Sequence, residues 1–208
     1  MIQKDIDRTM QEALQVLRKG GVILYPTDTV WGLGCDATDP AAVARIYAIK
    51  QRSDSKSLVL LASDLDMVAR YVRQIPSMAI DLMEVNDKPM TLIYPGAIAG
   101  DAPKEGELPK GNRYHLAFNV VAEDGSVGMR IPMMDFCRNL VAKLGRPLVS
   151  TSANLSGDPT PAKFVDVEEE IRAAVDYTVD ARLEKGATGK ASQIIQVGLD
   201  GEVRILRM

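Results

Sequence analysis

The chain has 208 residues, of which 46% are hydrophobic, so it can bury one sizeable core and we expect a single domain over residues 1–208. Its 25 Lys and Arg residues are offset by 28 Asp and Glu residues, which gives a net charge of −3. This balance disfavours a protein that coats nucleic acid through a dominant basic field, but it allows a local group of cations around a phosphate.

Apolar periodicity predicts helices that alternate with short apolar strands. Residues 5–19 show helical spacing and end at a pair of glycines, and the apolar run 22–25 before Pro26 is typical of a buried strand. The Asp39–Pro40 pair marks a helix start, which predicts a helix over 39–50. Further helices are expected at 63–71, 77–85, 133–144 and 167–175, and further strands at 58–62, 90–94, 126–131, 148–150, 193–197 and 203–206. The alternation predicts a single α/β domain around a mixed sheet.

Residues 95–125 have a different composition, rich in Gly, Pro, Lys and Asn and weak in periodicity. The sequence leaves open whether they form an ordered excursion around residues 116–118 or a mobile loop.

Three polar segments stand at strand or helix ends, where α/β folds place ligands. In PTDTVWGLG, residues 26–34, Thr27 and backbone N–H groups could approach a small ligand, but a capped turn with Trp31 in the core is an equal alternative. Residues 50–56, KQRSDSK, gather three cations, which favours a polyphosphate between them, although a solvated loop would also explain them. Residues 150–157, STSANLSG, could serve a nucleotide or a helix cap.

Cysteine and histidine usage excludes several kinds of site. Cys35 and Cys137 are far apart and His115 is the single histidine, so we expect free thiols and neither a disulfide framework nor a zinc site. A catalytic set built on histidine is disfavoured for the same reason. No apolar run approaches the length of a membrane span and the first residues lack a signal-peptide core, so we expect a cytoplasmic protein.

Four motifs in order carry a resemblance to a known family. PTDTVWGLG, KQR with SKSLVLL, GMRIP and STSANLSG, spread over about residues 20–207, closely resemble the YrdC-like threonylcarbamoyl-AMP synthases in their single-domain form. The resemblance implies a twisted mixed β-sheet flanked by helices, with a concave, positively lined cleft. It also implies a nucleotidyltransferase that makes threonylcarbamoyl-AMP and pyrophosphate from L-threonine, bicarbonate and ATP, for the threonylcarbamoyladenosine modification of tRNA.

The resemblance further implies roles for individual residues. The catalytic cations would be Lys50 and Arg52. L-Threonine would be bound by Thr27, Arg130, Ser150 and Ser192. ATP would be bound by Arg52, Lys56, Ser126, Ser152, Asn154, Thr160 and Arg207. No side chain is expected to bind a metal, since Mg²⁺ would be held by the triphosphate and water. The resemblance also implies transient contact with the tRNA threonylcarbamoyltransferase complex or with tRNA.

Three other functions compete with the synthase. A YciO-like relative would bind nucleotide or RNA without catalysis, but that branch lacks the K-x-R and S-x-N pairs, which are present here as Lys50 with Arg52 and Ser152 with Asn154. The carbamoyl-transferring domain of hydrogenase maturation proteins would bring zinc-finger cysteines. A binding module for structured RNA is disfavoured by the net charge.

Overall fold

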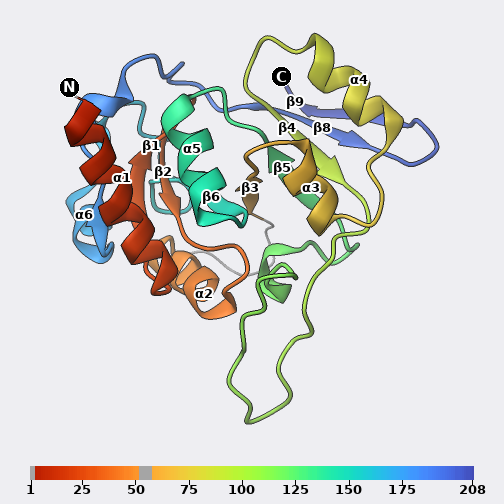
Figure 1. The fold of residues 1–208 in the computed structure, drawn as a ribbon, viewed down its shortest axis with the longest axis horizontal. Coiled ribbons are helices and arrows are strands. Elements are labelled where there is room, and N and C mark those ends of the chain that lie inside the picture. Colours follow the sequence, from red (N-terminus) through yellow and green to blue (C-terminus); the bar gives the residue numbers. More distant parts are fainter. Residues whose placement is uncertain (1–2, 52–57) are drawn as a thin grey trace.

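The computed structural model describes residues 3–51 and 58–208, in which helices and strands alternate as predicted (Figure 1). The α-helices are α1 (Gln3–Arg18), α2 (Pro40–Ile49), α3 (Leu65–Tyr71), α4 (Ser77–Val85), α5 (Asp135–Leu144) and α6 (Glu169–Ala174). The strands are β1 (Ile23–Pro26), β2 (Trp31–Gly34), β3 (Val59–Leu61), β4 (Met90–Tyr94), β5 (Val127–Arg130), β6 (Leu148–Ser152), β7 (Tyr177–Thr178), β8 (Gln193–Val197) and β9 (Val203–Arg207). Short 3-10 turns are η1 (Phe118–Val120), η2 (Phe164–Asp166) and η3 (Ala181–Glu184).

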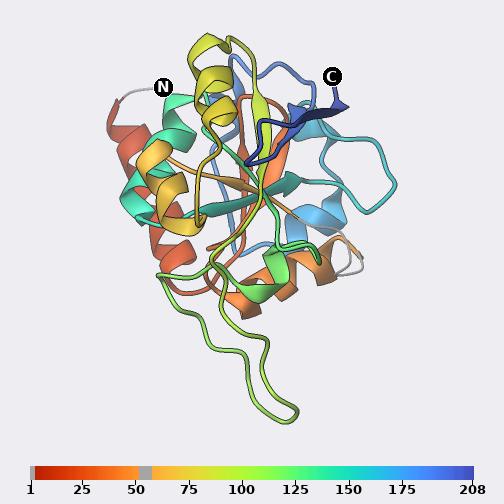
Figure 2. The ribbon, with the colours of Figure 1, turned by 90° about the vertical axis from the view of Figure 1, so that its right-hand side faces the viewer.

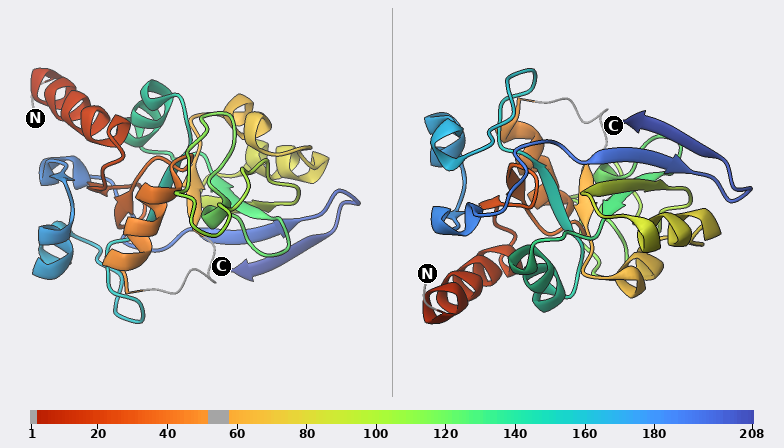
Figure 3. Two further views of the ribbon diagram at one scale, coloured as in Figure 1. Left: turned by 90° about the horizontal axis from the view of Figure 1, so that it is seen from below. Right: turned by 90° about the horizontal axis from the view of Figure 1, so that it is seen from above.

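The strands of the described chain form one mixed sheet in the order β7-β1-β2-β6-β3-β5-β4-β8-β9. Helices α1, α5, α3 and α4 lie on one side of this sheet, whereas α2, α6 and the loop over residues 153–162 lie on the other side (Figures 2 and 3). The single α/β domain predicted from the sequence is therefore confirmed. None of the helices in the described residues is long and apolar enough to cross a membrane.

Several predicted element ends are explained by their caps. Asp39 accepts hydrogen bonds from the N–H groups of Ala41 and Ala42 at the start of α2, as the sequence indicated. Asp64 caps α3 by accepting from Met67 N. Helix α5 ends at Gly145, whose φ of 74° is left-handed and therefore suits glycine.

Strand β2 is an element that the sequence did not reveal, because its residues, WGLG, were interpreted only as a ligand loop or a turn. It pairs antiparallel with β1, with Ile23 opposite Gly34 and Pro26 opposite Trp31. Glycine weakens a strand in isolation, so the pattern hides the strand. A Cβ at Gly34 would lie 2.7 Å from the Tyr25 ring, so the close packing of β2 explains the glycine.

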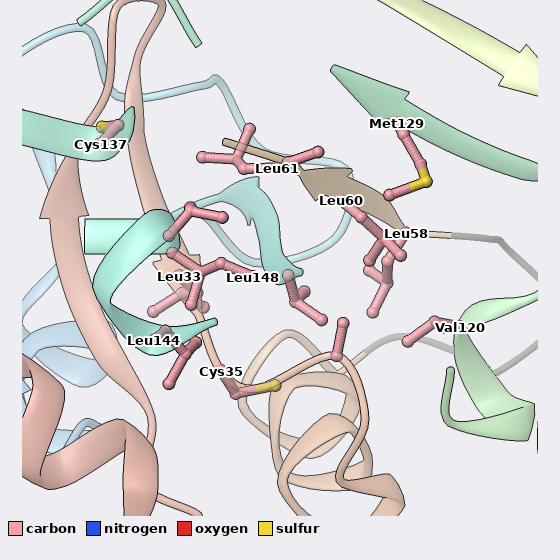
Figure 4. Close-up of a cluster of buried hydrophobic side chains, with 14 of the residues drawn as sticks. Leu33, Cys35, Leu58, Leu60, Leu61, Val120, Met129, Cys137, Leu144 and Leu148 are labelled. Atoms are coloured by element: carbon pink, nitrogen blue, oxygen red, sulfur yellow. The ribbon is translucent and has the colours of Figure 1, made fainter. Parts of the chain in front are cut away.

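The core lies between the sheet and the helices that cover it. Figure 4 shows Leu33 of β2, Leu60 of β3 and Leu148 of β6 in this cluster, together with Leu144 of α5, and all of them are buried. Removing such side chains from water is the main source of stability for the domain.

Both cysteines are free and buried, as predicted. Burial raises the pKa of the Cys35 thiol and of the Cys137 thiol, because a thiolate loses its hydration inside the protein.

The segment over residues 95–125 is an ordered excursion at its base, which answers the question that the sequence left open. Leu116 is buried and its N–H donates to Ile98 O, while Ala117 N donates to Ala37 O. Turn η1 closes this base against the domain. Between these anchors the chain projects away from the body of the protein as a long loop (Figures 1 and 2).

Candidate functional site

A pocket of about 260 Å³ lies between the β1–β2 turn, strand β6 and the C-terminal strands. It is slightly below the range of roughly 300–1,000 Å³ that is usual for small-molecule sites. Its wall includes most of the residues that the sequence analysis assigned to substrates, namely Thr27, Arg130, Ser150, Ser152, Thr160, Ser192 and Arg207. The fold therefore gathers distant motifs around one polar cavity.

Thr27 shapes the β1–β2 turn with its hydroxyl group. The hydroxyl donates to Val30 O (2.8 Å) and accepts from the N–H groups of Thr29 (3.1 Å) and Val30 (3.2 Å). The side chain is buried, with 1% of the residue exposed. Thr27 thus forms part of the pocket wall, but its hydrogen-bonding capacity is used within the turn.

Thr29 is a pocket residue that the sequence analysis did not single out. Its Oγ1 lies 2.8 Å from Thr27 Oγ1, and either hydroxyl could donate in this pair. Thr29 Oγ1 also accepts from Arg130 Nη2 at 3.2 Å. The Thr29 hydroxyl is therefore a polar group of the pocket wall that is held next to Arg130. The sequence signal that could have identified Thr29 is its place as the second threonine of the PTDT motif.

Arg130 is the last residue of strand β5 and lines the pocket. Its guanidinium group is held by Asp28, which is not part of the pocket wall. Its Nη1 donates to Asp28 Oδ1 at 2.6 Å, and the two side chains are only 4% and 7% exposed. The other oxygen of Asp28 accepts from Met133 N at 3.0 Å. The guanidinium group is therefore oriented before any ligand binds, which suits recognition of a carboxylate.

The far wall of the pocket is built by β8, β9 and the turn before β8. Ser192 Oγ lies 2.8 Å from Thr91 Oγ1, and Arg207 Nε donates to Ser192 O at 2.8 Å. Partial burial lowers the pKa of the Arg207 guanidinium, although it stays a cation at neutral pH. This wall supplies a second positive charge to the pocket, in addition to that of Arg130.

Lys50 follows helix α2 as its C-cap residue and turns its ammonium group into the protein. Its Nζ donates to Ser152 O (2.5 Å) and to Asn154 O (2.7 Å), and the residue is 3% exposed. Lys50 does not belong to the pocket wall, although it fixes the strand exit that carries Ser152. Its proposed direct contact with phosphate stays a prediction, and this geometry adds a positioning role.

Comparisons with known proteins agree with this arrangement. Residues 15–208 match the family model named Sua5_yciO_yrdC, which is described as telomere recombination. The chain belongs to the Sua5/YciO/YrdC family.

The curated relatives are similar over most of their length. A protein from Xanthomonas euvesicatoria named threonylcarbamoyl-AMP synthase is 35% identical over 191 residues, which are 91% of each chain. One of the same name from Chromohalobacter salexigens is 34% identical over 84% of this chain and 85% of that protein.

Solved structures of the family are similar to the whole fold. The crystal structure of E. coli YciO has a TM-score of 0.74 at 28% identity, over 96% of this chain and 88% of that one. A crystal structure of P. abyssi Sua5 complexed with L-threonine has a TM-score of 0.72 at 26% identity. It is matched over 90% of this chain and 50% of its own length, so this chain spans about half of that Sua5 protein.

Besides Lys50, two more of the assigned residues of this Sua5/YciO/YrdC protein lie outside the pocket. The Asn154 side-chain amide donates to Leu155 O (2.9 Å) and to Asp158 O (2.7 Å), so it stabilises the loop after β6. Ser126 lies at the other end of β5 from Arg130, about 13 Å away along a strand, and lines a separate cavity of about 180 Å³. A ligand must extend along the sheet beyond the first pocket to reach Ser126.

Arg52 and Lys56, the remaining assigned cations, lie outside the described residues. In the described part of the chain, no group of three or more His, Cys, Asp or Glu side chains could hold a metal ion. The pocket wall offers hydroxyl and guanidinium groups and no carboxylate from these described residues, so it does not fit a protein-held Mg²⁺.

Proposed function

We propose that the chain is a threonylcarbamoyl-AMP synthase, a nucleotidyltransferase that makes threonylcarbamoyl-AMP and pyrophosphate from L-threonine, bicarbonate and ATP. The observation that carries this proposal is the 35% identity, over 91% of both chains, to a relative with that name. The polar pocket between Arg130 and Arg207 supports it, because the reactants are anions that need neutralisation.

In this proposal L-threonine binds beside Arg130. The oriented guanidinium takes the carboxylate, and the Thr29 hydroxyl beside it accepts an N–H of the amino group. Ser150 and Ser192 complete the amino-acid site, and Thr27 acts through the turn that holds Thr29. The similarity to a Sua5 protein solved with L-threonine supports this choice of ligand.

ATP would occupy the side of the pocket lined by Ser152, Thr160 and Arg207. The amine of threonine adds to bicarbonate and releases water, and the resulting carbamate oxygen attacks the α-phosphate. Pyrophosphate then leaves with the electron pair of the broken P–O bond. We propose that Arg207, together with Arg52, Lys56 and the nearby Lys50, stabilises the negative charge that develops on these groups. Asn154 would hold the loop beside the nucleotide, and Ser126 would touch its distal part.

Mg²⁺ enters this scheme as part of the substrate. Since the pocket wall does not fit a protein-held ion, we propose that Mg²⁺ arrives on the triphosphate with its other positions filled by water. The tRNA, or the complex that modifies it, is proposed only as a transient partner.

The decisive experiment measures pyrophosphate release from ATP, with L-threonine and bicarbonate each omitted in turn. We expect release only when both are present, together with a product that carries AMP and threonine by mass spectrometry. The similarity to E. coli YciO favours one second candidate, a nucleotide-binding relative without this reaction. ATP binding without any pyrophosphate release would favour that candidate and contradict the synthase.

A further inference from the structure

Asp28 stands behind the pocket rather than in its wall. The residues on either side of it, Thr27 and Thr29, line the cavity, but Asp28 does not, and only 5% of it is exposed. Its contact with the cavity is made through Arg130, at 2.6 Å. Any effect of Asp28 on a ligand must therefore pass through that guanidinium group.

Both carboxylate oxygens of Asp28 are matched to donors from different parts of the fold. Oδ1 accepts from Arg130 Nη1, at the end of β5, and Oδ2 accepts from Met133 N, just before α5. A carboxylate is acceptor-only, so it satisfies both donors at once. An asparagine amide would turn its NH₂ group toward one of them, which sets donor against donor. The site therefore requires a carboxylate and not merely a side chain of this shape.

The second contact of Arg130 completes the arrangement. Its Nη2 donates to Thr29 Oγ1 at 3.2 Å, so the two terminal nitrogens are held by two adjacent residues of one turn. A planar guanidinium fixed at both Nη atoms has a single orientation. Its remaining N–H groups are then aimed without help from a ligand, and little side-chain entropy is lost when an anion binds.

We propose that Asp28 is a positioning residue for the amino-acid substrate, which fixes the Arg130 guanidinium so that it can fork onto the substrate carboxylate. The inference rests on the proposed function only in taking the ligand to be L-threonine. Asp28 contributes to the selection of a carboxylate-bearing ligand and not to the binding of ATP.

The test measures the affinity of the folded, full-length protein for L-threonine by calorimetry, for wild type and Asp28→Asn. We expect Asp28→Asn to weaken binding of L-threonine at least about tenfold, because a misaligned guanidinium loses a charge-assisted hydrogen bond. L-Threoninol, which lacks the carboxylate, is the matched probe, and its affinity should change by less than about twofold. Asp28→Glu, which retains both acceptors, should restore most of the affinity for L-threonine. Equal weakening for both probes would contradict the proposal.

Asp36→Asn is the matched control, since Asp36 is a similarly buried aspartate that pairs with the half-buried Arg146 away from the pocket. It should leave affinity for L-threonine within about twofold of wild type, whatever it does to stability. A thermodynamic cycle separates positioning from general damage. In an Arg130→Gln background, Asp28→Asn should cause no further loss of L-threonine affinity, and an additional tenfold loss would overturn the inference.

If Asp28→Asn does not fold, an NMR measurement on the wild-type protein tests the same inference. NMR signals of the Arg130 Nη protons should be resolved without ligand, since a guanidinium held at both ends rotates slowly, and they should shift when L-threonine is added. Averaged signals in the ligand-free protein would contradict the inference. A wild type that binds no L-threonine would instead defeat the proposed function.

Discussion

Two arginine–aspartate pairs of this protein, each with a buried aspartate, use the same chemistry in different places. Arg130 meets Asp28 at 2.6 Å, and Arg146 meets Asp36 at 2.5 Å. Each aspartate also accepts a backbone N–H, from Met133 in the first pair and from Thr38 in the second. The Arg130 side chain lines the polar pocket and is 4% exposed, whereas the Arg146 side chain is 26% exposed near α3 and the base of the long loop.

The positions of the two pairs show that ion pairs of the same chemistry can have different roles. Desolvation offsets much of the Coulomb attraction of such a pair, so its presence is weak evidence of a gain in stability. The Arg146–Asp36 pair joins the segment after β2 to the turn after α5, and we interpret it as a structural tie. The Arg130–Asp28 pair instead orients hydrogen-bond donors of the guanidinium group toward the pocket. Location relative to the pocket, and not the strength of the pair, separates the two roles.

The largest expected effect contrasts the two arginines. Arg130→Gln should weaken L-threonine binding by about 100-fold or more, because the carboxylate loses its charged partner. Arg146→Gln, the control, should leave it within about twofold. Calorimetric titration of both variants measures this contrast. Equal loss of L-threonine affinity in the two variants would contradict the assignment of different roles to the two pairs.

A second prediction concerns stability and the two aspartates. Asp28→Asn should lower the free energy of unfolding by about 3–5 kcal/mol, since it leaves the buried Arg130 guanidinium without its charged partner. Asp36→Asn should lower it by less, because the Arg146 guanidinium is 26% exposed and keeps part of its hydration. Urea unfolding at neutral pH measures both. An equal or larger loss for Asp36→Asn would contradict this order.

A third prediction separates the two cations of the pocket. Arg207→Gln should raise the KM for ATP about tenfold and leave the KM for L-threonine within about threefold, since Arg207 lies on β9, which β4 and β8 separate from the β5 strand of Arg130. Steady-state pyrophosphate release with each substrate varied gives both constants. A larger change in the KM for L-threonine than in the KM for ATP would contradict the placement of L-threonine beside Arg130.

The smallest effect concerns the thiols beside the two pairs. Cys137 lies close to Asp28 and Arg130, and Cys35 lies close to Asp36, and burial raises the pKa of both thiols. Because the folded state keeps its thiol protons to higher pH, stability is unaffected well below the ordinary thiol pKa of about 8.5. It falls as pH rises above that value, by up to about 1.4 kcal/mol per pH unit for each thiol. Urea unfolding between neutral pH and pH 9.5 should show this slope. Cys35→Ala and Cys137→Ala should each reduce it.

The candidate site was predictable to different degrees. The family resemblance assigned Arg130, Ser192 and Arg207 to one site, and the structure brings them around a single pocket. The sequence could not show that the Thr27 hydroxyl is used within its own turn while the Thr29 hydroxyl contacts Arg130. The first contact depends on the shape of the folded turn, and the second joins residues 101 positions apart. Nor could the sequence show that the Lys50 ammonium is turned toward carbonyl oxygens of another strand.

The sequence by itself determined the alternation of helices and strands, the helix caps and the free thiols, because these depend on local periodicity, on capping chemistry and on residue counts. Only the tertiary structure decided that WGLG is a strand, since Gly34 is favoured by close packing against Tyr25 and Gly32 by the approach of Thr151 O, and neither by strand propensity. It alone decided which of two Arg–Asp pairs faces a cavity. Residues distant in the chain meet only through strand order and register, and a linear pattern does not encode that order.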